Sequence, residues 1–186
     1  MAITAPRTVD VSFRAGRPGD ALCVGVLAMQ VFLDTYATEG IQPDLACEVL
    51  NEYMPQAFER RLSDEAQVFL LAERQGSLVA FAELALDNPC PVEASHGEAA
   101  EVVRLYVQSP FQAKGIGSVL LERLEDLAVR RGIFTLWLSA WAGNGRALAF
   151  YRARGYGDIG GVNHEIEGRT YENRVFIKKL RPTNAI

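Results

Sequence analysis

The sequence predicts a mixed α/β sheet within a single domain that spans residues 1–186. A length of 186 residues is typical of one domain. Hydrophobic residues make up 49% and charged residues 23%, close to the average of globular proteins, so the composition excludes a disordered or fibrous chain. Strand-like and helix-like segments alternate along the chain, which is the pattern of a sheet covered by helices.

The first third predicts one strand and two helices. Residues 11–14 alternate between polar and apolar side chains, as in a strand. Asp20 is placed to cap a helix, and apolar residues then recur at helical spacing as far as Tyr36. Gly40 and Pro43 end that helix, and a second helix is expected over 44–60.

The middle of the chain predicts three strands. Residues 67–73 and 78–86 are apolar runs joined by a Gln-Gly-Ser turn, which indicates an antiparallel hairpin. Two prolines and a glycine in 87–98 indicate a loop, and 101–107 is the next strand.

The last third adds two helices and further strands. Ile116, Leu120, Leu124 and Leu127 form one apolar stripe of a helix that ends at Gly132. A strand is expected over 135–141, a short helix over 146–154 closed by a glycine, and a final strand over 171–180, with room for one more strand between them.

Charge and hydropathy exclude several kinds of partner. The net charge of −4 argues against a broad basic face that binds nucleic acid. No apolar stretch approaches the ~20 residues that span a membrane. The first residues lack the basic and apolar regions of a signal peptide, so we expect a cytoplasmic protein.

Cysteine and histidine are too few and too scattered for common kinds of catalysis. Cys23, Cys47 and Cys90 form no metal-binding pattern and are expected to be reduced. Because His96 and His164 are the sole histidines, a zinc site or a Ser-His-Asp hydrolase is disfavoured, and we expect no metal.

A glycine-rich turn before the helix at 116 is the main chemical signal. Gly115 and Gly117 leave backbone N–H groups free at a helix N-terminus, where phosphate binds well, although the same pattern also occurs in a plain tight turn. Lys114 precedes Gly115 instead of following a glycine, so the P-loop pattern fails. Leu120 occupies the third glycine position of a dinucleotide fingerprint, which weakens that alternative as well.

Residues 101–121 (EVVRLYVQSPFQAKGIGSVLL) resemble the acyl-CoA signature of the GNAT superfamily of N-acetyltransferases, with Gln112, Gly115 and Gly117 at its defining positions. The resemblance continues through 137–144 (WLSAWAGN), Ala147, Phe150–Tyr151 and Gly155-Tyr156, and it covers nearly the whole chain. Residues 32–36 and 161–174 resemble the polyamine (spermidine/spermine) branch, with lower specificity.

The resemblance implies a six- to seven-stranded, mostly antiparallel sheet with helices on both faces. Strands 101–107 and 135–141 would be a splayed parallel pair with acetyl-CoA, the co-substrate, between them. The residues implied to bind it are Leu105, Tyr106, Val107, Gln112, Ala113, Lys114, Gly115, Ile116, Gly117, Ser118, Asn144 and Tyr151.

The resemblance also implies direct attack of an amine on the thioester. Tyr151 is the expected general acid, and the Val107 amide is the expected oxyanion donor. Glu101 or Glu83 could serve as the base, and either could instead be a solvated carboxylate. Tyr36, Glu83 and Glu101 are the candidate acceptor-binding residues, although an aromatic residue such as Tyr36 is also common in a core.

The acceptor is the least determined part of the prediction. Between Arg74 and Arg104 there is no Lys or Arg but five carboxylates (Glu83, Asp87, Glu93, Glu98 and Glu101), which would attract a small cationic amine such as spermidine. Alternatives are the N-terminus or a lysine of a protein. A non-catalytic acyl-CoA-binding regulator is an alternative of another class, and a homodimer is possible by analogy with the superfamily.

Overall fold

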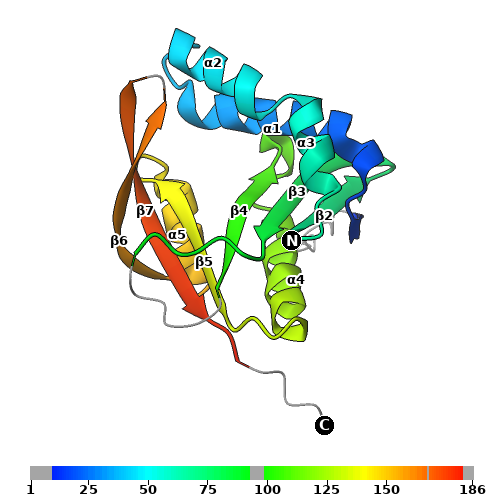
Figure 1. The fold of residues 1–186 in the computed structure, drawn as a ribbon. Helices are drawn as coiled ribbons and strands as arrows, with labels where there is room; N and C mark the ends of the chain where they lie inside the picture. The colour runs from blue at the N-terminus through cyan, green and yellow to red at the C-terminus, as the bar shows by residue number, and fades with distance from the viewer. Residues whose placement is uncertain (1–9, 93–98, 167, 182–186) are drawn as a thin grey trace, which may run out of the picture.

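A computed structural model describes residues 10–92, 99–166 and 168–181. Seven strands form one mixed sheet in the order β1-β2-β3-β4-β5-β7-β6 (Figure 1). The strands are β1 (Ser12–Ala15), β2 (Gln67–Arg74), β3 (Ser77–Ala85), β4 (Ala100–Val107), β5 (Thr135–Trp141), β6 (Gly157–Ile166) and β7 (Arg169–Lys179). The helices are α1 (Ala21–Tyr36), α2 (Pro43–Glu52), α3 (Pro55–Leu62), α4 (Ile116–Arg130) and α5 (Gly145–Ala153), with short 3₁₀ turns at Pro18–Asp20 and Ser109–Phe111.

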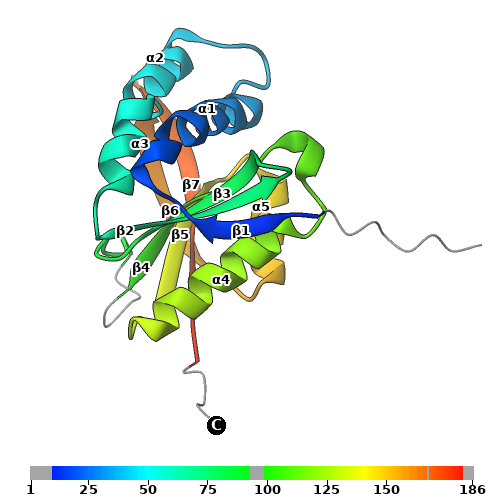
Figure 2. The ribbon, with the colours of Figure 1, turned by 90° about the vertical axis from the view of Figure 1, so that its right-hand side faces the viewer.

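Helices cover both faces of the sheet, and each face has its own core (Figure 2). On one face, α1, α2 and α3 pack on a cluster that includes Phe58, Phe69 and Phe81. On the other face, the apolar stripe of α4 packs on β2, β3 and β4 through residues such as Leu120 and Leu124. The single α/β domain architecture expected from the sequence is therefore confirmed.

β4 and β5 are the parallel pair, and they separate after a short contact. Their pairing is limited to Ala100 with Leu136 and Glu101 with Trp137, after which the strands diverge (Figure 1). Val103 is an extra residue at a β-bulge, because Glu83 pairs with Arg104 whereas Leu84 pairs with Val102. A bulge bends its strand, so β4 turns away from β5 near the irregular pairing at Val103.

Two details of the sequence prediction need correction. The helix expected over 44–60 is two helices, because Met54 is extended (φ −62°, ψ 145°) before Pro55, which begins α3. Proline disfavours helical backbone at the preceding residue. β6 had no clear pattern in the sequence because most of its side chains are exposed, so neither period marks it.

None of the helices in the described part of the chain is both long and apolar enough to span a bilayer.

Candidate active site

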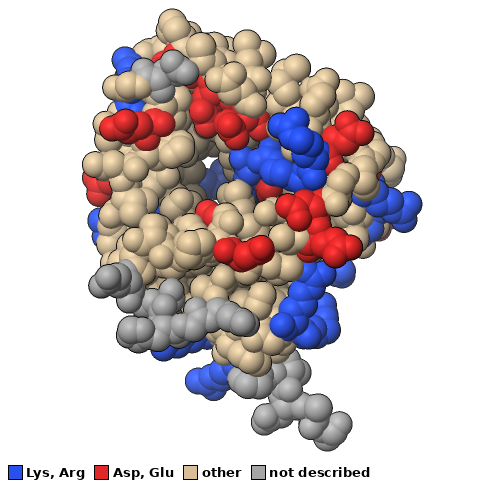
Figure 3. Space-filling view, viewed as in Figure 1, with Lys and Arg blue, Asp and Glu red and all other residues tan. Residues whose placement is uncertain are grey.

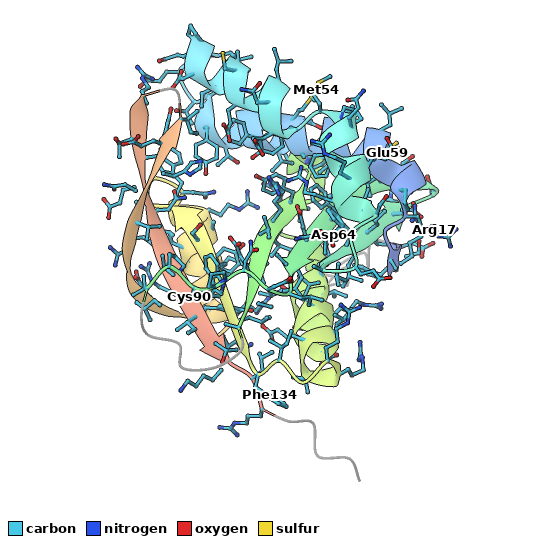
Figure 4. The ribbon with its side chains drawn as sticks, in the orientation of Figure 1. Arg17, Met54, Glu59, Asp64, Cys90 and Phe134 are labelled. Carbon is cyan, nitrogen blue, oxygen red and sulfur yellow. The ribbon has the colours of Figure 1, made fainter. Side chains whose placement is uncertain are left out.

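A cavity of about 1430 Å³ lies where β4 and β5 diverge, and elements from both halves of the chain line it. Side chains of α1, α2, β4 and β5 project toward this space, and the segment that carries Cys90 crosses in front of the two strands (Figure 4). Figure 3 shows the hollow on this face, with acidic side chains along its upper edge over α1 and α2 and basic ones to its right.

The edge of β4 that faces β5 offers unpaired backbone groups. The Gln108 amide donates to the Val79 carbonyl (3.0 Å), so Val107 and Ala80 are a non-hydrogen-bonded pair of the antiparallel ladder. It follows that the N–H and C=O groups of Leu105 and Val107 point away from β3 and toward the cavity, while those of Tyr106 point toward β3. The Val107 carbonyl already accepts from Gln112 Nε2 (2.8 Å), but its amide is available to a ligand.

The N-terminus of α4 opens onto the same cavity. Gly115 adopts a left-handed conformation (φ 84°) and begins α4, and Ala113 also has a positive φ of 57°. The Val119 amide makes the first helical bond to the Gly115 carbonyl (3.1 Å), so the three preceding amides, those of Ile116, Gly117 and Ser118, lack helical partners. These amides and the helix dipole make a site for an anion such as a diphosphate.

Two arginines of the α5 region add positive charge beside these amides. Arg146 donates to Gln112 Oε1, and Arg154 donates to Ser118 Oγ. The Nε atom of Arg154 is buried and has no partner within the described structure. This cationic wall suits the phosphates of a nucleotide, and the free edge of β4 suits an extended amide chain that pairs like an added strand.

Tyr151 lies on α5 and faces the cavity between the two strands. Its side chain is 9% exposed, and burial raises its pKa well above the usual range, with a smaller contribution from Tyr106. The phenol is therefore protonated throughout the neutral and mildly alkaline range, so it can donate a proton there.

Glu101 lines the cavity at the point where β4 and β5 part. Its carboxylate accepts a hydrogen bond from Asn88 Nδ2 (2.7 Å), and the Asn88 carbonyl accepts from Trp137 Nε1 (3.0 Å). Burial raises the pKa of Glu101, against the opposing effects of Asn88 and Arg104. A carboxylate with a raised pKa is a better proton acceptor, which is what a general base needs.

Glu83 is placed differently. Its side chain is 1% exposed and does not line the cavity. One oxygen accepts from Arg104 (2.7 Å), and the other lies 3.8 Å from Arg61 Nε. Removing one partner of such a buried ion pair lowers the free energy of unfolding by about 3–5 kcal/mol, so we assign this carboxylate a structural role.

The acidic stretch expected between Arg74 and Arg104 is therefore partly neutralised by basic residues of the protein. Glu83 is neutralised within the protein, and Glu93 and Glu98 lie outside the described residues. Of that stretch, Glu101 lines the cavity, and three further carboxylates join it from α1 and α2: Asp34, Glu48 and Glu52. Aromatic rings lie among them, and the Tyr36 ring packs against Trp141 in a tilted contact with 5.2 Å between the ring centroids.

Comparison with known proteins identifies the fold. Residues 32–156 match the model of the acetyltransferase (GNAT) family. The chain belongs to the GNAT family. The crystal structure of PaiA N-acetyltransferase from Thermoplasma acidophilum in complex with coenzyme A superimposes with a TM-score of 0.70, covering 91% of this chain and 99% of that one. At 21% identity, this likeness establishes the GNAT fold alone.

Two curated relatives match parts of the GNAT domain. The IAA acetyltransferase of Azospirillum brasilense is 36% identical over 92 residues, which are 50% of this chain and 56% of that protein. A [ribosomal protein bS18]-alanine N-acetyltransferase of Salmonella typhimurium is 39% identical over 59 residues, 32% of this chain and 40% of that protein. The matched regions thus span about half or less of these relatives.

Most of the residues predicted from the GNAT resemblance come together around one cavity. Lys114 does not line it: its ammonium donates to the Pro110 carbonyl (2.7 Å) and lies over the Phe111 ring. The Asn144 side chain lines the cavity and also caps α5 by accepting from the Ala147 amide (3.1 Å).

Sequence reasoning missed several lining residues: Arg146, Arg154, Glu48, Glu52, Trp141 and His164. Each belongs to an element whose sequence pattern reports its own packing and not what it faces. The one local signal was the presence of Arg146 and Arg154 at the two ends of the short helix after Asn144.

Proposed function

We propose that the protein is an acetyl-CoA-dependent N-acetyltransferase that acts on a primary amine. The observation that carries this proposal is the convergence of three features on one cavity: the free edge of β4, the open amides at the start of α4, and the buried phenol of Tyr151. The first suits the pantetheine arm, the second the diphosphate, and the third the thioester sulfur.

The reaction is a direct transfer in a ternary complex. Glu101 takes a proton from the substrate ammonium, directly or through water, and the free amine attacks the thioester carbon. The Val107 amide donates to the oxyanion. As the C–S bond breaks, Tyr151 gives its proton to the thiolate and takes up the proton that the attacking nitrogen loses, so that the amide and free coenzyme A are released. Glu101 returns the first proton to solvent. Burial that raises the pKa of Tyr151 also desolvates the thiolate, which keeps the two groups matched.

The acceptor we favour is a small cationic amine such as the polyamine spermidine. Four carboxylates line the cavity, and the charge of Arg104, which also lines it, is taken up by Glu83. A protein N-terminus is the second candidate, because one matched relative is named as an enzyme that acetylates the alanine of a ribosomal protein. A homodimer and a cytoplasmic location stay predictions.

A thiol-release assay with acetyl-CoA tests both the acetyl-transfer activity and the choice of acceptor. The panel contains spermidine, free amino acids, and peptides that begin with alanine. We expect spermidine to be acetylated with a KM that rises with salt, because carboxylates bind it through screened charges. Faster turnover of the peptides would assign the second candidate, and no thiol release with any amine would contradict the enzymatic function.

The raised pKa of Glu101 predicts the shape of the pH profile. A base must be deprotonated to act, so kcat/KM should fall as the pH drops through the pKa of Glu101, at a pH above the usual glutamate range. In Glu101→Gln this acid limb should vanish, and kcat should fall by about 10²-fold or more. An unchanged profile in the variant would remove Glu101 as the base.

A further inference from the structure

The strands β6 and β7 reach across the cavity to α2 (Figure 1). Asp44, in the first turn of α2, is a carboxylate that is 8% exposed. It accepts a hydrogen bond from the Tyr171 hydroxyl of β7 (3.0 Å), and Arg169 Nη1 lies 3.7 Å from the same oxygen. We call these three residues the Asp44 latch.

Apolar contacts continue the closure beside the latch. Ile166, the last residue of β6, is 3% exposed and belongs to the core of α1 and α2, although its strand lies at the far edge of the sheet. The Tyr36 ring contacts both Tyr171 (5.9 Å between centroids) and Trp141 (5.2 Å). Together these contacts join α1 and α2 to β5, β6 and β7.

The joined elements close one side of the cavity. Tyr36 and Trp141 line it, and so do His164 and Ile166 of β6 and Asn173 of β7. The hollow in Figure 3 is accordingly bounded on its left by the β6–β7 hairpin and above by α1 and α2. A molecule that approaches from that side meets the hairpin, so the hairpin limits access to the cavity there.

We propose that Asp44 determines acceptor specificity by holding the β6–β7 hairpin on α2, so that the cavity admits a slender, unbranched primary amine and rejects a branched one. This inference rests on the proposed function. Asp44 is a positioning residue: it acts through the hairpin and does not line the cavity itself.

Asp44 supplies polar contacts of this closure, to Tyr171 and Arg169 of β7. A buried carboxylate is costly unless its oxygens are paired, and here one oxygen holds both Tyr171 and Arg169. A hydrogen bond to a charged group is stronger than one between neutral groups. Losing it would shift the hairpin toward open positions without altering α4 or β4, which carry the acetyl-CoA side.

The test compares two acceptors in three variants. The probes are 1,4-diaminobutane and a derivative that carries a benzyl group on its carbon chain. Tyr171→Phe removes the latch hydroxyl without touching α2, and Asp44→Ala removes the carboxylate. Asp158→Asn is the matched control, because Asp158 of β6 pairs with Arg152 and Arg174 and does not line the cavity.

We expect the wild-type protein to favour the straight diamine. Since steric discrimination by a pocket is worth about 10–200-fold, the selectivity ratio in kcat/KM should fall by about tenfold in Tyr171→Phe and at least as far in Asp44→Ala. The KM for acetyl-CoA should stay within about twofold, as for a change remote from that ligand, and Asp158→Asn should keep the wild-type ratio. An unchanged ratio in Tyr171→Phe, the milder variant, overturns the proposal.

Hydrogen exchange without substrate separates this inference from the proposed function. Amides of β7 near Tyr171 should exchange faster in Tyr171→Phe than in wild type, whether or not any amine is acetylated. If wild type acetylates no amine, the proposed function fails and this exchange still decides whether the latch holds the hairpin. Equal exchange in the variant and wild type overturns the latch.

Discussion

Replacing Gly117 by glutamate is expected to abolish acetyl-CoA binding. A carboxylate at the start of α4 would lie among the amides that we assign to the diphosphate. Placing like charges together costs several kcal/mol, and each 1.4 kcal/mol is tenfold, so Kd should rise by more than about a hundredfold. Isothermal titration with coenzyme A measures this directly.

The variant should still fold, which makes the result interpretable. A Cβ atom built at Gly117 lies 3.7 Å from Val107 Cγ2 and 3.8 Å from Phe150 Cζ, which are ordinary contacts. Gly117→Gln is the matched control of the same length without the charge, and it should weaken binding less. Wild-type affinity in Gly117→Glu would show that the phosphates bind elsewhere.

Replacing Tyr151 by phenylalanine should lower kcat while leaving acetyl-CoA binding nearly intact. The change removes one hydroxyl from a ring that packs near Tyr156 and Phe176, so the fold is kept. Loss of a general acid typically costs about 10²–10⁴-fold, and we expect kcat to fall within this range. Steady-state kinetics at saturating amine, together with titration of coenzyme A, separate the two effects.

Tyr156 supplies the control for this experiment. It is buried like Tyr151, but its hydroxyl donates to Glu125 (3.1 Å) and it does not line the cavity. Tyr156→Phe should therefore retain wild-type kcat, with any loss confined to stability. Full activity in Tyr151→Phe would remove this residue as the acid and leave the thiolate to be protonated by water.

Local sequence patterns predicted most of the fold because most of its strands and helices have a clear apolar periodicity. The hairpin of β2 and β3 and the stripe of α4 follow from periodicity in the chain. The break at Pro55 was missed because the apolar spacing continues across it, from Val49 through Tyr53 to Phe58. β6 was uncertain because its side chains are mostly exposed and give no apolar pattern.

The site likewise has one part that local sequence predicts and another that depends on tertiary structure. The turn at Gly115 and Gly117 could be predicted because its amides come from one short segment. The surroundings of a carboxylate could not, since they depend on the tertiary structure: Glu83 meets Arg104 across a strand pair and Arg61 from α3. The structure distinguishes the two candidate bases: Glu101 lines the cavity, whereas Glu83 is buried and does not line it.

The bulge at Val103 determines which face of the sheet each later side chain of β4 occupies. Because of it, Val102 and Leu105 face the α4 core, while Arg104 faces the α3 side beside Tyr53 and Phe58. If Val103 were paired as a regular strand residue, every later side chain would turn to the opposite face, placing the Arg104 charge in the α4 core and the Val107 amide against β3. A chain that lacks Val103 would keep these faces, because Leu84 with Val102 and Glu83 with Arg104 are already consecutive pairs, but it would lose the bend. The bulge therefore lets β4 change direction near the point where β5 departs, while its side chains stay on the faces that the two cores require.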